Sequence, residues 1–298
     1  MRDTIIPVIF STDNNFFMPT YVALKSMLVT SRDSKCYIYI LHDTSFSEDN
    51  KRLLYDLVND ENREINQFRI NYISMGDEFI GSYENRGITH PCYFRLLIPW
   101  LLPQYDKVIY CDGDVVFRKS ISLLYNIDIG DAYCGGVKRY LYDGYSYKRH
   151  SSKLGLRPED YINTGVLIMN SKKIRQDNLK DSFVRLTKFK YKYFDQDIIN
   201  IVCYKNINSL PFEFNVTPTM DVKEDDIAII HYAGLKPWNH FVRRWYYWWD
   251  VYYHSSIYCP DLEKKIVDNP IGFKNMLKVW LKGNFPGLYV VIRNKFFT

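Results

Sequence analysis

The chain has 298 residues, of which 47% are hydrophobic and 17% aromatic, and its formal net charge is +5. This length allows one large core, or one α/β domain with a smaller appendage. No apolar run approaches the roughly 20 residues of a membrane-spanning helix, and the run at 5–10 is followed too soon by polar residues for a signal peptide. We therefore expect a soluble or peripheral protein.

Short apolar runs alternate with helical patterns over most of the chain. The runs that predict strands are 5–10, 37–41, 69–73, 108–110, 165–169 and 227–231. Helical spacing of apolar residues predicts helices at 19–29, 48–58, 91–97, after 171 and at 195–203. Ser47 is placed to cap the second helix and Pro99 to end the third. Strands that alternate with helices favour an α/β fold with a mostly parallel sheet flanked by helices.

Two stretches depart from this alternation. Residues 140–158 are rich in Tyr, Lys, Arg, Ser and Gly without any period, and we expect them to form a mobile excursion over the active site. Beyond Trp238 the chain becomes aromatic and basic. We place a boundary near residue 240, between a main domain of residues 1–240 and a C-terminal region of residues 241–298.

The C-terminal end carries the whole excess of positive charge. Residues 233–298 contain ten Lys/Arg and four Asp/Glu, whereas the preceding residues contain 29 and 30. We expect the aromatic residues at 245–249 to pack on the main domain. Residues 273–297, with lysines at 274, 278 and 282, are expected to contact an anionic membrane surface. Nucleic acid is the rival partner, but no motif for it is present, and we predict none.

The six cysteines form no CxxC pair and no spacing typical of metal sites; they are Cys36, Cys92, Cys111, Cys134, Cys203 and Cys259. A disulfide framework is unusual in a chain this long with so many core residues. We therefore predict free cysteines in a reducing compartment.

Two carboxylates, Asp112 and Asp114, follow the strand predicted at 108–110. Residues i and i+2 of a strand project to the same side, and Gly113 between them lets a ligand come close. Ligands of open α/β sheets bind beyond the carboxyl ends of the strands, and paired carboxylates there suit Mg²⁺ or Mn²⁺. The alternative is a polar turn. The pattern is not specific, because Asp195 and Asp197 repeat it within a predicted helix.

A second concentration of polar residues lies at the end of the last predicted strand. His231 ends the apolar run, Gly234 permits a close approach of the backbone, and Lys236 can meet a phosphate group. The imidazole would be a third metal ligand beside the two carboxylates. A lone histidine at a strand end is more often structural, but its clustering with Gly234 and Lys236 makes the functional interpretation competitive.

Six blocks in order along the first 240 residues give the chain its resemblance to a known family. They are Phe10-Ser-Thr-Asp-Asn-Asn15, Tyr93-Phe-Arg-Leu-Leu97, Tyr110-Cys-Asp-Gly-Asp-Val115, Asn163-Thr-Gly-Val-Leu-Ile-Met-Asn170, Asp195-Gln-Asp197 and the segment from His231 to Trp238. The chain resembles the retaining family 8 glycosyltransferases, which include bacterial lipopolysaccharide galactosyl- and glucosyltransferases and glycogenin. The resemblance implies a sheet of the GT-A type.

The resemblance also implies roles for individual residues. Asp112, Asp114 and His231 would hold Mn²⁺, with Mg²⁺ as the alternative, and Asp112 would also contact the donor. The other donor-binding residues would be Asp13 and Asn15 at the uridine, Arg95, Asn163, Gly234 and Lys236. Asp195 and Gln196 would lie at the donor sugar as the catalytic pair, with Gln196 on the face opposite the leaving group.

The chain departs from the family pattern at two points. One residue separates Gly234 from Lys236, where many members have two, and this affects how far Lys236 reaches. Arg139 occupies a region where a related galactosyltransferase has an acidic residue near the sugars. The donor sugar therefore stays open between glucose and galactose.

Retention of configuration requires either two inversions or attack from the side of the leaving group. Gln196 is a poor nucleophile, so we favour same-face attack through an oxocarbenium-like state, by analogy with the family. The predicted function is Mn²⁺-dependent transfer of a hexose from a UDP-sugar to a glycan or glycolipid acceptor, in bacterial surface polysaccharide or lipopolysaccharide synthesis. The predicted location is the cytoplasm, peripheral on the inner face of the cytoplasmic membrane. The alternative function is a non-catalytic nucleotide- or glycan-binding scaffold at the membrane.

Overall fold

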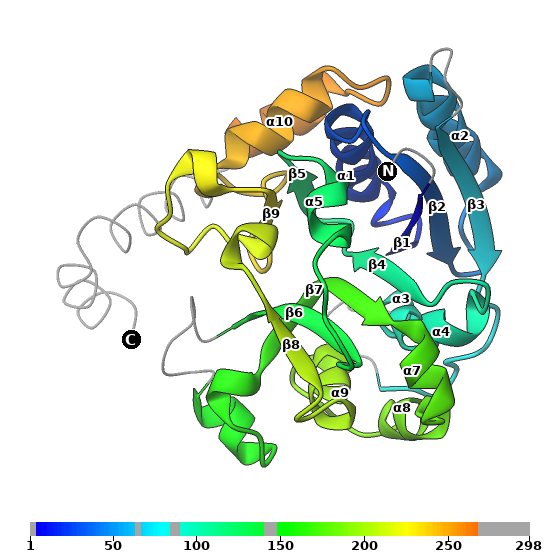
Figure 1. The fold of residues 1–298 in the computed structure, drawn as a ribbon. Helices are drawn as coiled ribbons and strands as arrows, with labels where there is room; N and C mark the ends of the chain where they lie inside the picture. Colours follow the sequence, from blue (N-terminus) through cyan, green and yellow to red (C-terminus); the bar gives the residue numbers. More distant parts are fainter. Residues whose placement is uncertain (1–3, 63–66, 84–89, 140–147, 268–298) are drawn as a thin grey trace, which may run out of the picture.

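The structure is a computed structural model, and it describes residues 4–62, 67–83, 90–139 and 148–267. A seven-stranded sheet with the order β3-β2-β1-β4-β7-β6-β8 forms its centre (Figure 1). Its strands are β1 (Ile5–Thr12), β2 (Lys35–His42), β3 (Phe68–Ser74), β4 (Lys107–Cys111), β6 (Cys134–Lys138), β7 (Ile162–Asn170) and β8 (Ile207–Leu210). Only β7 runs antiparallel to its neighbours, β4 and β6. The predicted mostly parallel α/β sheet is confirmed.

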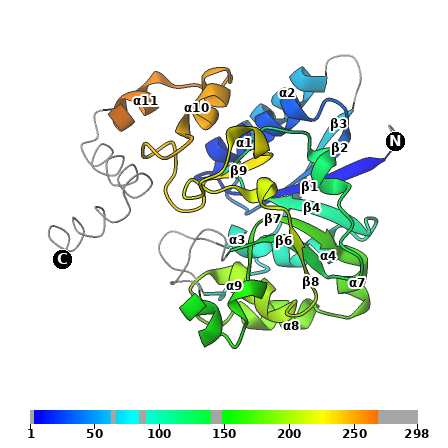
Figure 2. The ribbon, with the colours of Figure 1, turned by 60° about the vertical axis from the view of Figure 1, so that its left-hand side comes forward.

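Helices cover both faces of this sheet, and Figure 2 shows α1 and α2 on the side opposite α8 and α9. The α-helices that have defined bounds are α1 (Phe17–Thr30), α2 (Glu48–Asn62), α3 (Pro91–Phe94), α4 (Ile98–Leu101), α5 (Ile121–Tyr125), α7 (Ser171–Gln176), α8 (Lys180–Leu186), α9 (Phe194–Val202), α10 (Trp245–Tyr253) and α11 (Pro260–Val267). Successive residues of β1 serve opposite faces: Val8 and Phe10 join the core beneath α1 and α2, and Ile9 joins the core beneath α3 and α9. This two-sided burial explains why the strand is apolar throughout.

Local sequence predicted some element ends and missed others. Ser47 caps α2 as predicted, since its hydroxyl accepts from the Asn50 amide at 3.2 Å. Pro99, however, does not end the helical stretch; it lies in the first turn of α4, where the missing N–H of proline costs nothing. Strand β6 was not predicted because two of its five residues are Gly135 and Gly136, and glycine is uncommon in strands. Strand β8 was not predicted either, because it has only four residues.

The topology brings two strand ends to one edge. The chain runs outward from β1 through β2 to β3, and then returns to place β4 on the other side of β1. Ligands of such sheets bind at this reversal, beyond the carboxyl ends of the strands. A small second sheet of β5 (Val115–Phe117) and β9 (Ile229–His231) begins beside the same edge.

Helix α10 is packed against the rest of the molecule by a cluster of aromatic residues. Trp248 is 0% exposed, and Trp249 is also buried, beside residues of α1, β5 and β9. Before the helix, Arg244 adopts a positive φ of 65°, and its carbonyl accepts from the Tyr232 hydroxyl at 2.6 Å. The expected packing of the residues at 245–249 is therefore confirmed for Trp248 and Trp249, whereas Trp245 is half-buried against the same cluster and Tyr246 is 47% exposed.

Parts of the predicted excursion and of the C-terminal region lie outside the described residues. Of the excursion, residues 148–153 form a helical turn, and residues 140–147 are not described. The predicted membrane-contacting residues 273–297 are not described either, and the division at residue 240 stays a prediction. Among the described residues, none of the helices combines the length and the apolar character needed to cross a membrane.

Truncating Trp248 tests whether α10 belongs to the cooperative fold. We expect Trp248→Ala to lower the free energy of unfolding by about 3–5 kcal/mol, since it removes a fully buried indole from a packed cluster. Tyr246→Ala on the same helix is the control and should cost less than about 1 kcal/mol. Urea denaturation followed by fluorescence measures both values, and equal effects would show that α10 is not part of the core.

Candidate active site

A cleft of about 680 Å³ opens at the edge where β1 and β4 end. It collects side chains from distant parts of the chain, as the paired strand ends require. All eleven residues predicted for the site line it: Asp13, Asn15, Arg95, Asp112, Asp114, Asn163, Asp195, Gln196, His231, Gly234 and Lys236. Their roles stay predictions, but the structure brings them together.

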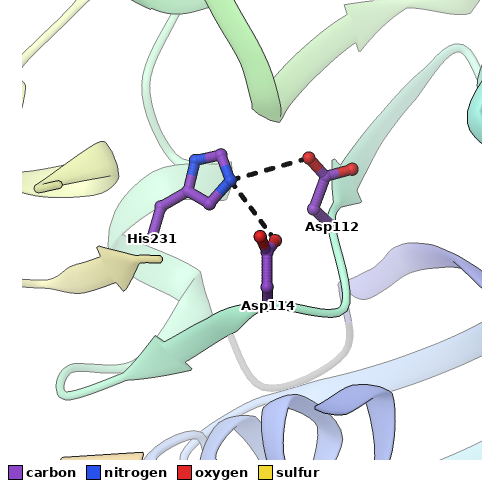
Figure 3. A group of neighbouring side chains, drawn as sticks. All are labelled: Asp112, Asp114 and His231. Atoms are coloured by element: carbon purple, nitrogen blue, oxygen red, sulfur yellow. Dashed lines mark ion pairs between the residues drawn. The ribbon is translucent and has the colours of Figure 1, made fainter. Parts of the chain in front are cut away.

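The two carboxylates and the imidazole point toward one another (Figure 3). His231 Nε2 lies 3.3 Å from Asp114 Oδ1 and 3.7 Å from Asp112 Oδ2. The carboxylates follow the strand as predicted and lie in the loop between β4 and β5, so the alternation of side chains along a strand does not bring them together. Convergence comes instead from the pairing of β5 with β9, in which Val115 lies opposite His231.

This group of three has the character of a cation site. One ligand atom from each of the three side chains lies within 4.8 Å of the others. Among the described residues, Asp114 Oδ1 is buried without a hydrogen-bond partner, and a bound cation would satisfy it. Gly165 leaves the necessary room, because a Cβ there would collide with His231 Cε1 and lie 2.7 Å from Asp112 Oδ2. Two carboxylates and an imidazole therefore fit a divalent metal ion.

Lys236 adds a positive charge to the part of the cleft formed by Asp112, Asp114 and His231, the metal corner. Its ammonium donates to Asp114 Oδ2 and, at 3.0 Å, to the carbonyl of Tyr232. Burial is the largest single influence and raises the pKa of Asp114, but the charges and hydrogen bonds of Lys236 and His231 together outweigh it, and the pKa falls far below the usual range. Asp114 is therefore ionised at any physiological pH.

Arg95 connects the first acidic pair to the second. Its guanidinium bonds Asp112 Oδ1 at 2.7 Å and Asp195 Oδ2 at 3.0 Å, and donates to the Thr164 carbonyl at 2.8 Å. It also lies 4.2 Å from the centre of the Tyr110 ring, and only 6% of Arg95 is exposed. One buried cation thus fixes the spacing between the loop after β4 and the start of α9.

Asp195 is held in an unusual state by this arrangement. Burial is the main cause that raises its pKa; the Arg95 charge works in the opposite direction, and Asp112 raises the pKa further. The result is a pKa of about 7. One guanidinium compensates one carboxylate, so Asp112 and Asp195 compete for the same positive charge.

The Gln196 side chain is fixed at both ends of its amide. Its Oε1 accepts from Arg139 at 3.0 Å, and its Nε2 donates to the Tyr161 hydroxyl at 3.0 Å. The Tyr161 hydroxyl in turn donates to Asp197, which is 0% exposed and also accepts from the Tyr193 amide at 3.0 Å. The two carboxylates of the second acidic pair therefore have different surroundings. Asp195 bonds Arg95, whereas Asp197 accepts from the Tyr161 hydroxyl that contacts Gln196.

Comparison with known proteins identifies the family. The model for glycosyl transferase family 8 matches residues 7–241, well over half of the chain. The chain belongs to glycosyl transferase family 8. The predicted resemblance is therefore confirmed, and membership implies a sugar-nucleotide donor and a glycan acceptor in general terms.

Individual members share about a quarter of their residues with this chain. A lipopolysaccharide 1,2-glucosyltransferase of Escherichia coli K12 is 25% identical over 247 residues, covering 78% of this chain and 72% of the relative. Galactinol synthase 5 of Arabidopsis thaliana is 27% identical over 217 residues, covering 60% and 63%. Glycosyltransferase GlyE of Streptococcus pneumoniae is 24% identical over 272 residues; this covers 84% of the chain but only 61% of the relative.

Solved structures agree on the fold. The galactosyltransferase LgtC in complex with donor and acceptor sugar analogues has a TM-score of 0.71 and 25% identity, covering 88% of this chain and 100% of that chain. The bifunctional glycosyltransferase WbbM has a TM-score of 0.74 and 23% identity, covering 89% and 52%. The GT-A type of sheet is therefore confirmed, and the chain is a glycosyltransferase.

Three residues of this family 8 site, Tyr110, Gly165 and Asn215, were not singled out for it from the sequence, and the contact of Arg139 with Gln196 was not predicted. Tyr110 donates to Asp112 Oδ1 at 2.9 Å, and Arg139 donates to Gln196 Oε1 at 3.0 Å. Asn215 bonds His231 Nδ1 at 2.8 Å, and Gly165 leaves room for the metal ligands. Tyr110 and Gly165 lie inside recognised blocks, so a closer reading of these blocks could have found them. Asn215 ends the short turn Phe212–Asn215 and carries no local signal.

The raised pKa of Asp195 predicts a pH-dependent stability. In the window between about pH 4 and pH 7 the folded chain binds a proton that the unfolded chain releases, so the free energy of unfolding falls as pH rises. Asp195→Asn has no proton to release at this position, so it lacks this pH dependence. The free energy of unfolding of Asp195→Asn minus that of wild type should therefore rise by about 2–3 kcal/mol from pH 5 to pH 8. Urea denaturation in EDTA measures it, with exposed Asp181→Asn as the control. Parallel pH profiles for Asp195→Asn and wild type would contradict the assignment.

Proposed function

We propose that the chain transfers a hexose, glucose or galactose, from a UDP-sugar to a glycan or glycolipid acceptor, with retention of configuration and with Mn²⁺. The observation that carries the proposal is one cleft that holds Asp112, Asp114, His231 and Lys236 beside Asn163, Asp195 and Gln196. A site for a cation and a diphosphate would thereby adjoin a site for a sugar. Relatives named as glucosyltransferase and galactosyltransferase support the substrate class.

In this proposal the metal corner receives the diphosphate. Asp112, Asp114 and His231 would hold the ion, and their mixed oxygen and nitrogen donors favour Mn²⁺ over Mg²⁺. The bound ion would neutralise the negative charge that grows on the departing UDP. Lys236 reaches this corner although only one residue separates it from Gly234, whose φ of +100° suits glycine. The Lys236 ammonium would meet the phosphate oxygens as a point charge.

The uridine would lie at the end of β1, the strand that pairs with β4. Asp13 and Asn15 line this part, and Asp13 is kept in place because its Oδ1 accepts from the Phe16 amide at 2.8 Å. The Asn15 side chain is exposed, so it is available to a nucleoside. The donor sugar would then lie between Asn163, Asp195 and Gln196.

The contacts of Gln196 bear on how configuration is retained. A neutral amide is a weak nucleophile, and here its oxygen already accepts a hydrogen bond from the Arg139 guanidinium. Asp195 is engaged by Arg95. Both observations favour same-face attack, in which Asp195 and Gln196 orient the sugar and the leaving phosphate assists the acceptor hydroxyl. Trapping a covalent glycosyl adduct on Asp195 would overturn this mechanism in favour of double displacement.

Release of UDP tests the proposal directly. We expect the chain with Mn²⁺ to release UDP from UDP-glucose or UDP-galactose, slowly with water and faster with an acceptor. Asp114→Asn should reduce release by at least about 100-fold, because it weakens the charge that holds the ion. Asp49→Asn, on the exposed surface of α2, is the control.

The outcome also separates the two candidate functions. Binding of UDP without release from any UDP-sugar would favour the scaffold function. If the chain neither binds UDP nor releases UDP from any UDP-sugar, the proposed function is contradicted altogether.

We also propose that the C-terminal region brings the enzyme to its acceptor. Its basic charge suits the anionic inner face of a bacterial cytoplasmic membrane, where lipid-linked acceptors are made. A lipopolysaccharide glucosyltransferase among the relatives supports a role in surface glycan synthesis. The support from this chain is its sequence, since residues 268–298 lie outside the described part.

Vesicle sedimentation tests membrane association. We expect binding to phosphatidylglycerol vesicles that falls with salt, and little binding to phosphatidylcholine. Replacing Lys274, Lys278 and Lys282 with Gln should weaken binding, since each cation contributes about 1 kcal/mol near the surface. Replacing the exposed Lys188 and Lys190 is the matched control. Equal binding to both vesicle types would contradict the proposal.

A further inference from the structure

Asn215 lies directly behind the metal corner. It ends the short 3₁₀ turn Phe212–Asn215, is 0% exposed, and is not among the residues that line the cleft. Its Oδ1 lies 2.8 Å from His231 Nδ1, and its Nδ2 lies 2.9 Å from Asn163 Oδ1. A single buried amide therefore joins a metal-corner residue to a sugar-side residue.

The direction of these hydrogen bonds follows from a backbone group. The Gly165 amide can only donate, and it donates to Asn163 Oδ1 at 2.8 Å. The atom of Asn163 that faces Asn215 is therefore the carbonyl oxygen, so Asn215 must present its NH₂ group to it. The other end of the Asn215 amide is then an acceptor, and His231 Nδ1 must carry a proton.

The orientation of the Asn215 amide determines which group each neighbouring side chain presents to the cleft. With the proton on Nδ1, the lone pair of a neutral His231 is on Nε2, the atom that faces Asp112 and Asp114. With its oxygen bonded to Gly165 and Asn215, Asn163 keeps its NH₂ group for the cleft that it lines. The Asn215 amide thus determines both the nitrogen that His231 presents to the metal corner and the NH₂ group that Asn163 presents to the cleft.

We propose that Asn215 is a positioning residue that fixes the His231 tautomer for metal binding and the Asn163 amide for the donor sugar. The inference rests on the proposed function for the identity of the metal and the sugar. It adds a physical link between the two halves of the site, through a residue that touches neither ligand. Groups that orient metal-bound histidines typically change metal affinity 10- to 100-fold when removed.

Two substitutions separate the two roles. Asn215→Leu has nearly the same shape but loses both hydrogen bonds. Asn215→Asp keeps the acceptor for His231 Nδ1 but cannot donate to Asn163, whose amide would then have to turn. Asn62→Leu is the matched control, because Asn62 is also buried and makes two hydrogen bonds, to Phe68, away from the cleft.

The first measurement is calorimetric titration of the metal-free protein with Mn²⁺, without any nucleotide. We expect Asn215→Leu to bind Mn²⁺ roughly 10- to 100-fold more weakly, and Asn215→Asp to bind it at least as tightly as wild type. The second is binding of UDP and of UDP-sugar at saturating Mn²⁺. Asn215→Asp should bind UDP normally, but the ratio of its affinity for UDP-sugar to its affinity for UDP should fall roughly tenfold. The reason is that the turned Asn163 amide would present its oxygen to the sugar in place of its NH₂ group.

A third measurement needs no variant at Asn215 and no bound ligand. Nitrogen-15 NMR of labelled histidine, with the signal assigned by its loss in His231→Gln, should show Nδ1 of His231 protonated in the metal-free wild type. An unprotonated Nδ1 would overturn the inference, as would unchanged Mn²⁺ affinity in a folded Asn215→Leu. If wild type bound no Mn²⁺ and released no UDP, the proposed function would fail, whereas the NMR result would still decide the role of Asn215.

Discussion

The buried guanidinium of Arg95 is the constraint on which the cleft depends. Taking a cation and two carboxylates out of water costs free energy, and a buried ion pair of this kind is weak support for stability. Its value lies in geometry. Asp112 follows β4 and Asp195 begins α9, so their separation would otherwise depend on two independent loops. Both bond the same planar group, which is itself tied to the Thr164 carbonyl and the Tyr110 ring. The first acidic pair and the second are thereby held as one unit.

The metal corner is built by a different device, the small β5–β9 sheet. Pairing of Val115 with His231 places the imidazole beside the loop that carries Asp112 and Asp114. The aromatic cluster under α10 packs against these two strands, so helical residues beyond the matched family domain support the geometry of the corner. The positions of the three side chains, Asp112, Asp114 and His231, therefore depend on segments more than 100 residues apart. A pattern of two carboxylates can exist in any turn, but it becomes a site only where such supports converge.

The sequence predicted what local chemistry determines. The end of a buried strand located Asp112 and Asp114, the end of another located His231, and ordered family blocks supplied the rest. It did not predict β6, because Gly135 and Gly136 have no side chains to give a periodic pattern. It misjudged Pro99, because a proline that ends one helical turn can equally begin the next. It did not find Asn215 or the contact between Arg139 and Gln196, because these depend on pairings between distant segments that no short window contains.

Among the described residues, Arg95 and Lys236 bind carboxylates of the cleft, and they differ in what they can do during a reaction. Arg95 is 6% exposed, contacts five groups, and has no position to move to without leaving two carboxylates unpaired. Lys236 is more exposed and bonds one carboxylate oxygen through a flexible stem. In the proposed reaction Asp114 would help to hold a divalent ion, and the Lys236 ammonium would then be free to bind the phosphate oxygens. In this proposal the cleft would combine the fixed charge of Arg95, which holds Asp112 and Asp195 in place, with the mobile charge of Lys236, which would bind the diphosphate. Only the second has to move for the site to exchange substrate for product.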